Sequence, residues 1–157
     1  MYVDSQLLFS DAQAITADAV GTNVIDLSQD RSIGGGEAMC VMFSVDVAAD
    51  QTSSDEDYTF EVEYSSDAAQ TTARKRVGFT AYQSGTPAAP TLNADLLVAG
   101  YKFFLPIPPG PLSISERFLG IRYDVTGTSP TITCTAVLMP MSMVDADAVY
   151  VDGFTIQ

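Results

Sequence analysis

The chain has 157 residues, of which 46% are hydrophobic and 17% charged, a composition typical of one globular domain. Twenty acidic residues against seven basic ones give a net charge of −13. Because binding to nucleic acids and to anionic membranes depends on lysine and arginine, this charge argues against both partners. We therefore expect no nucleic-acid partner and no membrane partner.

The first eleven residues contain the apolar run Leu7-Leu8-Phe9 between Asp4 and Asp11. The charged residues on either side of this run and the absence of a basic leader argue against a signal peptide. The sequence also contains no apolar stretch of about 18 residues, the length that would predict a membrane-spanning helix. We expect residues 1–11 to form an N-terminal arm. Residues 11–20 have helical potential, but the spacing of their apolar side chains is irregular.

Alternation of apolar and polar residues with a period of two dominates the rest of the chain. It predicts strands at 41–47, 58–64, 119–125 and 132–138, with weaker candidates at 23–27, 76–82, 96–105 and 149–156. In the first of these, Val41, Phe43, Val45 and Val47 share the face expected to be buried. Strands about ten residues apart, separated by glycine and proline turns, predict an all-β sandwich, jelly roll or barrel.

The chain beyond Leu138 departs from this pattern. Pro140 is expected to interrupt or end its strand, because proline cannot donate to the hydrogen-bond ladder. We assign residues 12–138 to a β-sandwich core and 139–157 to a C-terminal extension of the same single domain. The apolar end of this extension, with Phe154 and Ile156, either adds a last strand to a sheet of its own subunit or reaches a neighbouring subunit.

Residues that would support catalysis are scarce. The chain has no histidine, so a Ser-His-Asp triad, a Cys-His pair and a histidine zinc site are all impossible. Cys40 and Cys134 lie in apolar runs and are expected to be buried free thiols, although a bridge between neighbouring strands stays possible. We predict no enzymatic activity and no cofactor.

Each of three charged segments could form a binding site or could simply be exposed to solvent. Two acidic groups could ligate calcium, but neither has the spacing of an EF-hand, so solvated acidic loops are expected: Asp55-Glu56-Asp57, and Asp145, Asp147 and Asp152. A glycosidase would need two such carboxylates in one cleft, and nothing points to that arrangement. The basic triplet Arg74-Lys75-Arg76 is expected to be exposed at a strand start; pairing with a partner's acidic surface is the alternative.

Several segments carry a resemblance to a known family: residues 1–16, 21–27, 98–110, 116–119 and 123–131. They include Leu105-Pro106-Ile107-Pro108-Pro109-Gly110 and Tyr123-Asp124-Val125-Thr126-Gly127-Thr128. In this order they resemble the capsid cement (decoration) proteins of short-tailed bacteriophages, best known from a Bordetella phage. The chain differs from that pattern in residues 50–73, which look longer and more polar, and in its tail.

The resemblance implies a jelly-roll-like antiparallel β-sandwich with extended N- and C-terminal segments, made in the bacterial host cytoplasm and bound to the outer surface of an icosahedral head. The implied partners are the major capsid protein, whose neighbouring subunits it clamps, and copies of itself in a dimer or trimer. No catalytic residues come with the family. The alternative is a carbohydrate- or receptor-binding β-sandwich module of a virion fibre.

Two interface hypotheses follow from the apolar ends. Leu7, Leu8 and Phe9 are assigned to a subunit or shell interface, because an exposed apolar triplet is otherwise a liability. Serine at all three positions is expected to abolish capsid binding and leave the fold intact. Phe154 and Ile156 are assigned to an intersubunit contact, so that deletion of residues 139–157 should weaken assembly more than monomer stability.

Overall fold

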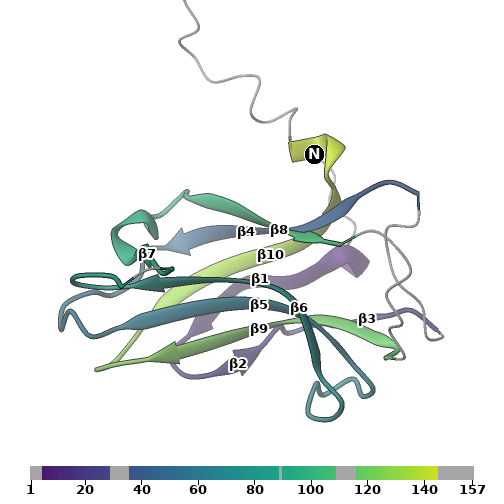
Figure 1. Ribbon diagram of the computed structural model, residues 1–157, viewed down its shortest axis with the longest axis horizontal. Coiled ribbons are helices and arrows are strands. Elements are labelled where there is room, and N and C mark those ends of the chain that lie inside the picture. The colour runs from purple at the N-terminus through teal and green to yellow at the C-terminus, as the bar shows by residue number, and fades with distance from the viewer. Residues whose placement is uncertain (1–4, 29–35, 89, 109–115, 145–157) are drawn as a thin grey trace, which may run out of the picture.

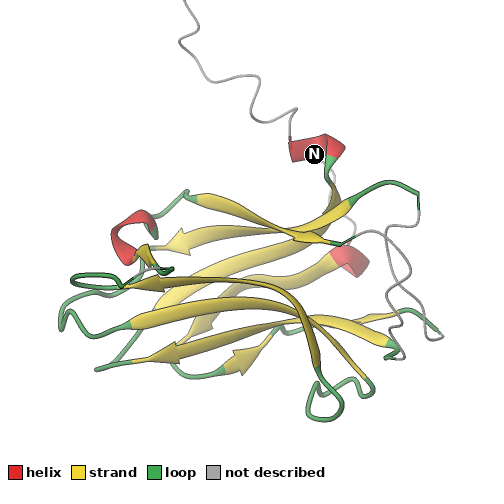
Figure 2. Ribbon diagram, viewed as in Figure 1, coloured by secondary structure: helices red, strands yellow, loops and turns green. Residues whose placement is uncertain are grey.

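The computed structural model describes residues 5–28, 36–88, 90–108 and 116–144, which form two β-sheets packed face to face (Figure 1). Helix within these residues is limited to short turns, η1 (Ser5–Leu7), η2 (Ala94–Leu96) and a turn at 142–144 (Figure 2). The all-β class predicted from the period-two pattern is confirmed.

Each sheet is built from strands distant in sequence. The first sheet has the order β1 (Leu8–Ile15), β10 (Ile132–Pro140), β4 (Met39–Val47) and β8 (Lys102–Ile107). The second has the order β2 (Ala19–Val20), β9 (Phe118–Thr126), β5 (Asp57–Ser65), β6 (Lys75–Gln83) and β7 (Leu92–Asn93). A further short strand, β3 (Ile25–Asp26), also pairs with β9.

The strand order identifies the sandwich as a jelly roll. Count β2 and β3 as one interrupted strand, set β7 aside, and number the remaining eight strands in chain order. The first sheet then has the order 1-8-3-6 and the second the order 2-7-4-5. This is the order of two interlocked Greek keys. The pairs within it are antiparallel, as expected, and the short β7 departs from that rule by pairing in parallel with β6.

Aromatic side chains fill the space between the sheets. Phe43 and Phe103 of the first sheet stack with ring centroids 5.1 Å apart, and Phe60 of the second meets Phe103 edge-on at 4.9 Å. The buried hydroxyl of Tyr123 donates a hydrogen bond to Ser10 Oγ over 3.0 Å. Because each ring meets its neighbours at a favourable angle and the buried hydroxyl has a partner, the core holds the two sheets in one arrangement.

The four strongest strand predictions are confirmed by β4, β5, β9 and β10. Of the weaker ones, 76–82 is confirmed by β6, while 23–27 shrinks to β3 and 96–105 begins as a turn that leads into β8. The candidate at 149–156 lies outside the described residues. Residues 11–20 form no helix, because β1 runs through them to Ile15 and β2 follows at Ala19–Val20 after a short bend.

The burial predicted for Val47 is wrong. Val41, Phe43 and Val45 are buried in the core, but the side chain of Val47 is 58% exposed. The register explains the difference, because Cys134 of β10 pairs with Val45 and Thr133 pairs with Val47, which leaves Asp46 as an extra residue. Such a bulge reverses the alternation of side chains beyond it.

The two predicted ends of the core also differ from expectation in part. Strand β1 begins at Leu8, so the last residues of the expected arm are a strand of the first sheet. Pro140 is the last residue of β10, where it pairs with Met39, as the rule for proline in strands predicts.

Both cysteines are buried free thiols, as expected. Cys134 belongs to the core between the sheets, whereas Cys40 belongs to a small apolar cluster on the outer face of the first sheet. A bridge between them is excluded because the two thiols lie on opposite faces of one sheet. Burial raises the pKa of Cys134 to about 12, so this thiol is unreactive at neutral pH.

Candidate interaction surfaces

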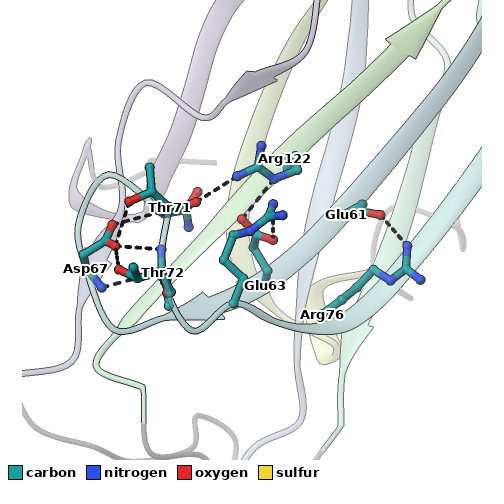
Figure 3. Close-up of polar contacts among 10 residues, drawn as sticks. Glu61, Glu63, Asp67, Thr71, Thr72, Arg76 and Arg122 are labelled. Atoms are coloured by element: carbon teal, nitrogen blue, oxygen red, sulfur yellow. Dashed lines mark hydrogen bonds and ion pairs between the residues drawn. The ribbon is translucent and has the colours of Figure 1, made fainter.

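The outer face of the second sheet carries a network of ion pairs between neighbouring strands (Figure 3). In the register of the sheet, Glu61 of β5 lies beside Arg122 of β9, and Glu63 lies beside Arg76 of β6. Arg122 Nε is 3.2 Å from Glu63 Oε1, and Arg76 pairs with Glu61. Opposite charges therefore alternate across three strands.

Glu63 is the centre of this network. Its side chain is only 2% exposed, and burial raises the pKa of its carboxyl group, an effect that the charges of Arg122 and Arg74 oppose. Arg74 Nη1 approaches Glu63 Oε2 to 3.5 Å from the turn before β6. A buried carboxylate that depends on two arginines fixes the positions of both.

The loop at 66–72 is fastened to the same network. Asp67 accepts hydrogen bonds from the hydroxyl group of Thr72 and from the backbone N–H groups of Thr71 and Thr72, at 3.0 and 2.8 Å, and these bonds, the hydroxyl first, lower the pKa of Asp67. Arg122 Nη2 donates to the backbone carbonyl of Gln70 over 2.8 Å, and the Gln70 side chain covers Gly120 so closely that a Cβ there would lie 1.5 Å from its terminal amide group. This ordered loop is part of the polar segment that differed from the family pattern.

The network borders a shallow cavity of about 320 Å³ lined by Glu61, Glu63, Arg74, Arg76, Arg122 and Asp124. Both glutamates in it are held by arginines, which makes the surface charge-balanced. Burial and the neighbouring carboxylate of Asp18 raise the pKa of Asp124. The cavity is therefore a polar surface suited to hydrogen bonding and ion pairing.

The basic triplet lies exposed at the start of β6, as predicted. Each of its side chains already has an acidic partner in this chain: Arg74 pairs with Glu63, Lys75 with Glu116 and Arg76 with Glu61. Pairing with a partner's acidic surface would have to displace these contacts.

The acidic loop at 55–57 differs from the expected solvated loop. Glu56 is fully buried, and its carboxylate accepts hydrogen bonds from Ser53 N at 3.0 Å and from Ser84 Oγ at 2.9 Å. It therefore organises the turn before β5.

Across the part of the chain that the structure describes, no three histidine, cysteine, aspartate or glutamate side chains gather to hold a metal ion. Asp145, Asp147 and Asp152 lie outside that part.

The buried Glu56 carboxylate should make stability depend on pH. Burial raises its pKa, but the hydrogen bonds from Ser53, Ser84 and Asp55 outweigh that effect and lower the pKa below the ordinary value of a glutamate. A carboxyl whose pKa is lowered by folding stabilises the protein above its ordinary pKa, and the contribution disappears as the pH falls. We expect Glu56→Gln to lower the melting temperature at pH 7, and we expect its difference from the parent to shrink as the pH falls below the ordinary pKa of glutamate.

Thermal unfolding followed by circular dichroism across this pH range measures the effect. Asp11→Asn, at an exposed position of β1, is the matched control and should shift the melting temperature little throughout this range. A constant difference between Glu56→Gln and the parent at all pH values would contradict the assignment.

The outer face of the first sheet is apolar over part of its area. Cys40 and Met42 of β4 and Val137 and Met139 of β10 form a buried cluster there. Five partly buried side chains pack against the cluster: Leu7, Leu8, Phe104, Met141 and Val144. Residues near both ends of the described chain therefore meet on one face.

The predicted interface residues fall into three groups. Leu7 and Leu8 are half-buried against the outer apolar cluster. Phe9 is completely buried in the core between the sheets and has no surface to offer a partner, so the expected exposed triplet is wrong at this position. Phe154 and Ile156 lie outside the described residues.

Sequence reasoning missed the outer apolar cluster, although a signal for it was present. Val41-Met42-Phe43 and Val137-Leu138-Met139 are continuous apolar runs inside alternating strands. Such runs are typical of strands buried on both faces. The ion pairs of the second sheet left no comparable signal, because their partners come from different strands.

Among the described residues, no helix is both long enough and apolar enough to cross a membrane.

Comparison with known proteins gives one assignment. The family model Bbp16, which describes a family of Bordetella phage proteins, matches residues 9–138. No curated protein sequence shows significant similarity to the chain. The matched range extends from the second residue of β1 nearly to the end of β10 and so includes both sheets of the jelly roll. The chain therefore belongs to the Bbp16 family of bacteriophage proteins.

Proposed function

We propose that this protein is a structural component of the virion that binds the outer surface of an icosahedral phage head and clamps neighbouring major capsid subunits together. The observation that carries the proposal is the family match over residues 9–138, the same region in which the sequence resembles capsid cement proteins. In this role the protein is not an enzyme, needs no cofactor and works as a homo-oligomer, a dimer or a trimer.

The physical properties of the domain suit such a role. A protein that binds only the assembled shell stabilises it by mass action, and many copies make a moderate single contact strong. The tight aromatic core and the ion pairs across the second sheet give a stiff body that loses little conformational freedom on binding. Half-buried Leu7 and Leu8 place apolar surface at the edge of the first sheet, where a neighbour can cover it.

Co-sedimentation with the heads of the phage that encodes the protein tests this function. We expect saturable binding of the purified protein to expanded heads at a fixed number of copies per capsid subunit, together with a higher temperature of head disruption. Protein that stays at the top of the gradient at all concentrations would contradict the proposal.

The same assay examines the C-terminal contact proposed for Phe154 and Ile156. Removal of residues 139–157 is not a clean test, because Met139 is 5% exposed and Pro140 pairs with Met39 in the first sheet. Ending the chain after Val144 keeps β10 complete. Binding by this shortened chain as strong as that of the full chain would remove these two residues from the interface.

The alternative of a carbohydrate-binding module needs an exposed aromatic platform. Among the described residues, Phe79 is the one largely exposed aromatic side chain, and the Arg76 guanidinium lies 4.4 Å from its ring centroid. One face of this ring is therefore covered, which disfavours sugar stacking. Binding on a glycan array, combined with no binding to heads, would favour this alternative.

A further inference from the structure

One end of the sandwich carries a group of exposed apolar side chains. Val47 is 58% exposed, Val98 53% and Leu96 43%, and the small side chains of Ala48 and Ala99 are exposed beside them in sequence. We call these five residues the end patch. In Figure 1, the end of β4 and the η2 turn that leads toward β8 lie at this same end of the molecule.

Backbone hydrogen bonds hold the two halves of the end patch together. Ala49 N donates to Leu97 O over 3.0 Å, and Gly100 N donates to Val45 O over 2.7 Å. These bonds extend the pairing of β4 and β8 beyond Lys102, the first residue of β8. Val47 lies between Val45 and Ala49 on one segment, and Val98 and Ala99 lie between Leu97 and Gly100 on the other, so the two hydrogen bonds bring these three residues to one place in the sheet.

The exposure of Val47 is built into the sheet. The bulge at Asp46 turns Val47 out of the core, although the alternation of β4 assigns it to the buried face. Bulges often re-aim a side chain near a functional site. A large apolar side chain turned into water by such a feature marks a candidate contact surface.

Acidic residues flank the segments of the end patch in sequence. Asp46 and Asp95 are exposed next to Val47 and Leu96 in sequence, and Asp50 follows on the same loop, half-buried. The carboxylates of Asp50 and Asp95 accept hydrogen bonds from the uncharged Thr52 and Asn93. Within the described residues, Lys102 is the one cation on the adjoining strands, because the others belong to β6, to β9 and to the residues just before those two strands.

This charge pattern selects the partner. Two copies meeting through the end patch would bring their acidic rims together, and like charges facing each other across an interface oppose binding. A partner with an apolar centre and a basic rim would instead bury Val47 and Val98 and neutralise the aspartates. The large negative charge of the whole chain favours the same kind of partner.

We propose that the end patch docks onto a protein surface that is apolar at its centre and basic at its rim, and that this surface lies on the outside of the phage head. The proposal rests on the function proposed above. It assigns the shell contact to one end of the jelly roll and leaves the apolar cluster on the first sheet for contacts of the chain with itself.

The test is head co-sedimentation with the double variant Val47→Ser/Val98→Ser. Both side chains are largely exposed, so the variant should keep the melting temperature of the parent. We expect its affinity for heads to fall about tenfold or more, since apolar side chains at the centre of an interface carry much of the binding energy. Phe79→Ser, which removes an equally exposed apolar side chain from β6, is the matched control and should bind as the parent does.

A charge variant tests the rim separately. Raising the salt concentration should weaken binding of the parent, and Asp95→Asn, which keeps the shape of the side chain, should reduce this salt dependence. Equal salt dependence in both proteins would overturn the basic-rim part of the proposal.

The outcomes separate the two proposals. Head binding by the parent and Phe79→Ser, with loss in Val47→Ser/Val98→Ser, supports both. Equal binding by all three overturns the end patch and leaves the proposed function in place. No binding by the parent overturns the proposed function and the end patch with it. Dissociation of an oligomer by the double variant in sedimentation equilibrium would show that a second copy occupies the patch, which also overturns the proposal.

Discussion

Phe9→Ala is expected to lower the free energy of unfolding by about 3–5 kcal/mol, the usual cost of deleting a buried phenylalanine ring. Phe9 is completely buried in the core between the sheets, on the edge strand β1. Its loss would leave a cavity in the core cluster to which Phe9 belongs, and a close-packed interior relaxes only partly to fill such a space. Urea unfolding at pH 7, followed by circular dichroism, measures the effect.

Leu8→Ala is the matched control. Leu8 is the neighbouring residue of the same strand, but it is half-buried and packs on the outer apolar cluster. We expect Leu8→Ala to lower the free energy of unfolding by less than half as much as Phe9→Ala, because part of the Leu8 side chain is already in contact with water. Equal losses at the two positions would show that β1 does not contribute Phe9 to the core as the structure has it.

The burial of Phe9 also determines which variants can test the proposed N-terminal interface. Serine at Leu7, Leu8 and Phe9 together cannot leave the fold intact, because Phe9 is a core residue. A loss of head binding in that triple variant would report unfolding. Serine at Leu7 and Leu8 alone tests the interface hypothesis without opening the core.

Arg122→Met is expected to lower the free energy of unfolding by about 2–3 kcal/mol, because it removes charged hydrogen bonds to buried groups. Arg122 donates to Glu63 Oε1 and to the Gln70 carbonyl, and so holds both a buried carboxylate and the loop at 66–72. In the variant, Glu63 keeps only the longer contact with Arg74, at 3.5 Å. A buried carboxylate with too little compensating charge is costly.

The pH dependence identifies the cause of this loss. Burial raises the pKa of Glu63, so its charged form opposes folding, and this penalty is absent at low pH, where the group is protonated. Removing a compensating arginine increases the penalty. The difference in the free energy of unfolding between Arg122→Met and the parent should therefore shrink as the pH falls toward 4. Adding Glu63→Gln to Arg122→Met should restore part of the lost stability at pH 7.

Arg76→Met is the control for a more exposed pair. The Arg76 side chain is 50% exposed and its partner Glu61 11% exposed, so water screens their attraction. We expect a loss of about 1 kcal/mol or less. If Arg76→Met were as costly as Arg122→Met, the centre of the network would not be Glu63.

The sequence alone was sufficient to predict the fold class and most strands. In β5 and β9, tyrosine, phenylalanine, valine and isoleucine alternate with polar residues, and each strand turns its apolar face to the core and its polar face to the outside of the sheet. This period is a property of the extended backbone, so it can be recognised without knowing which strands are neighbours. The ending of β10 at Pro140 and the burial of both cysteines are also local consequences of residue type.

Tertiary structure decided the features that depend on register and on contacts between distant segments. The bulge that exposes Val47 exists only because β4 pairs with β10 at a particular offset. Glu56 is buried because Ser84, from the turn after β6, reaches its carboxylate. Phe9 became a core residue, rather than part of an arm, when β1 joined the edge of the first sheet. Each of these outcomes depends on which side chains meet across space, and a local sequence pattern contains no record of that pairing.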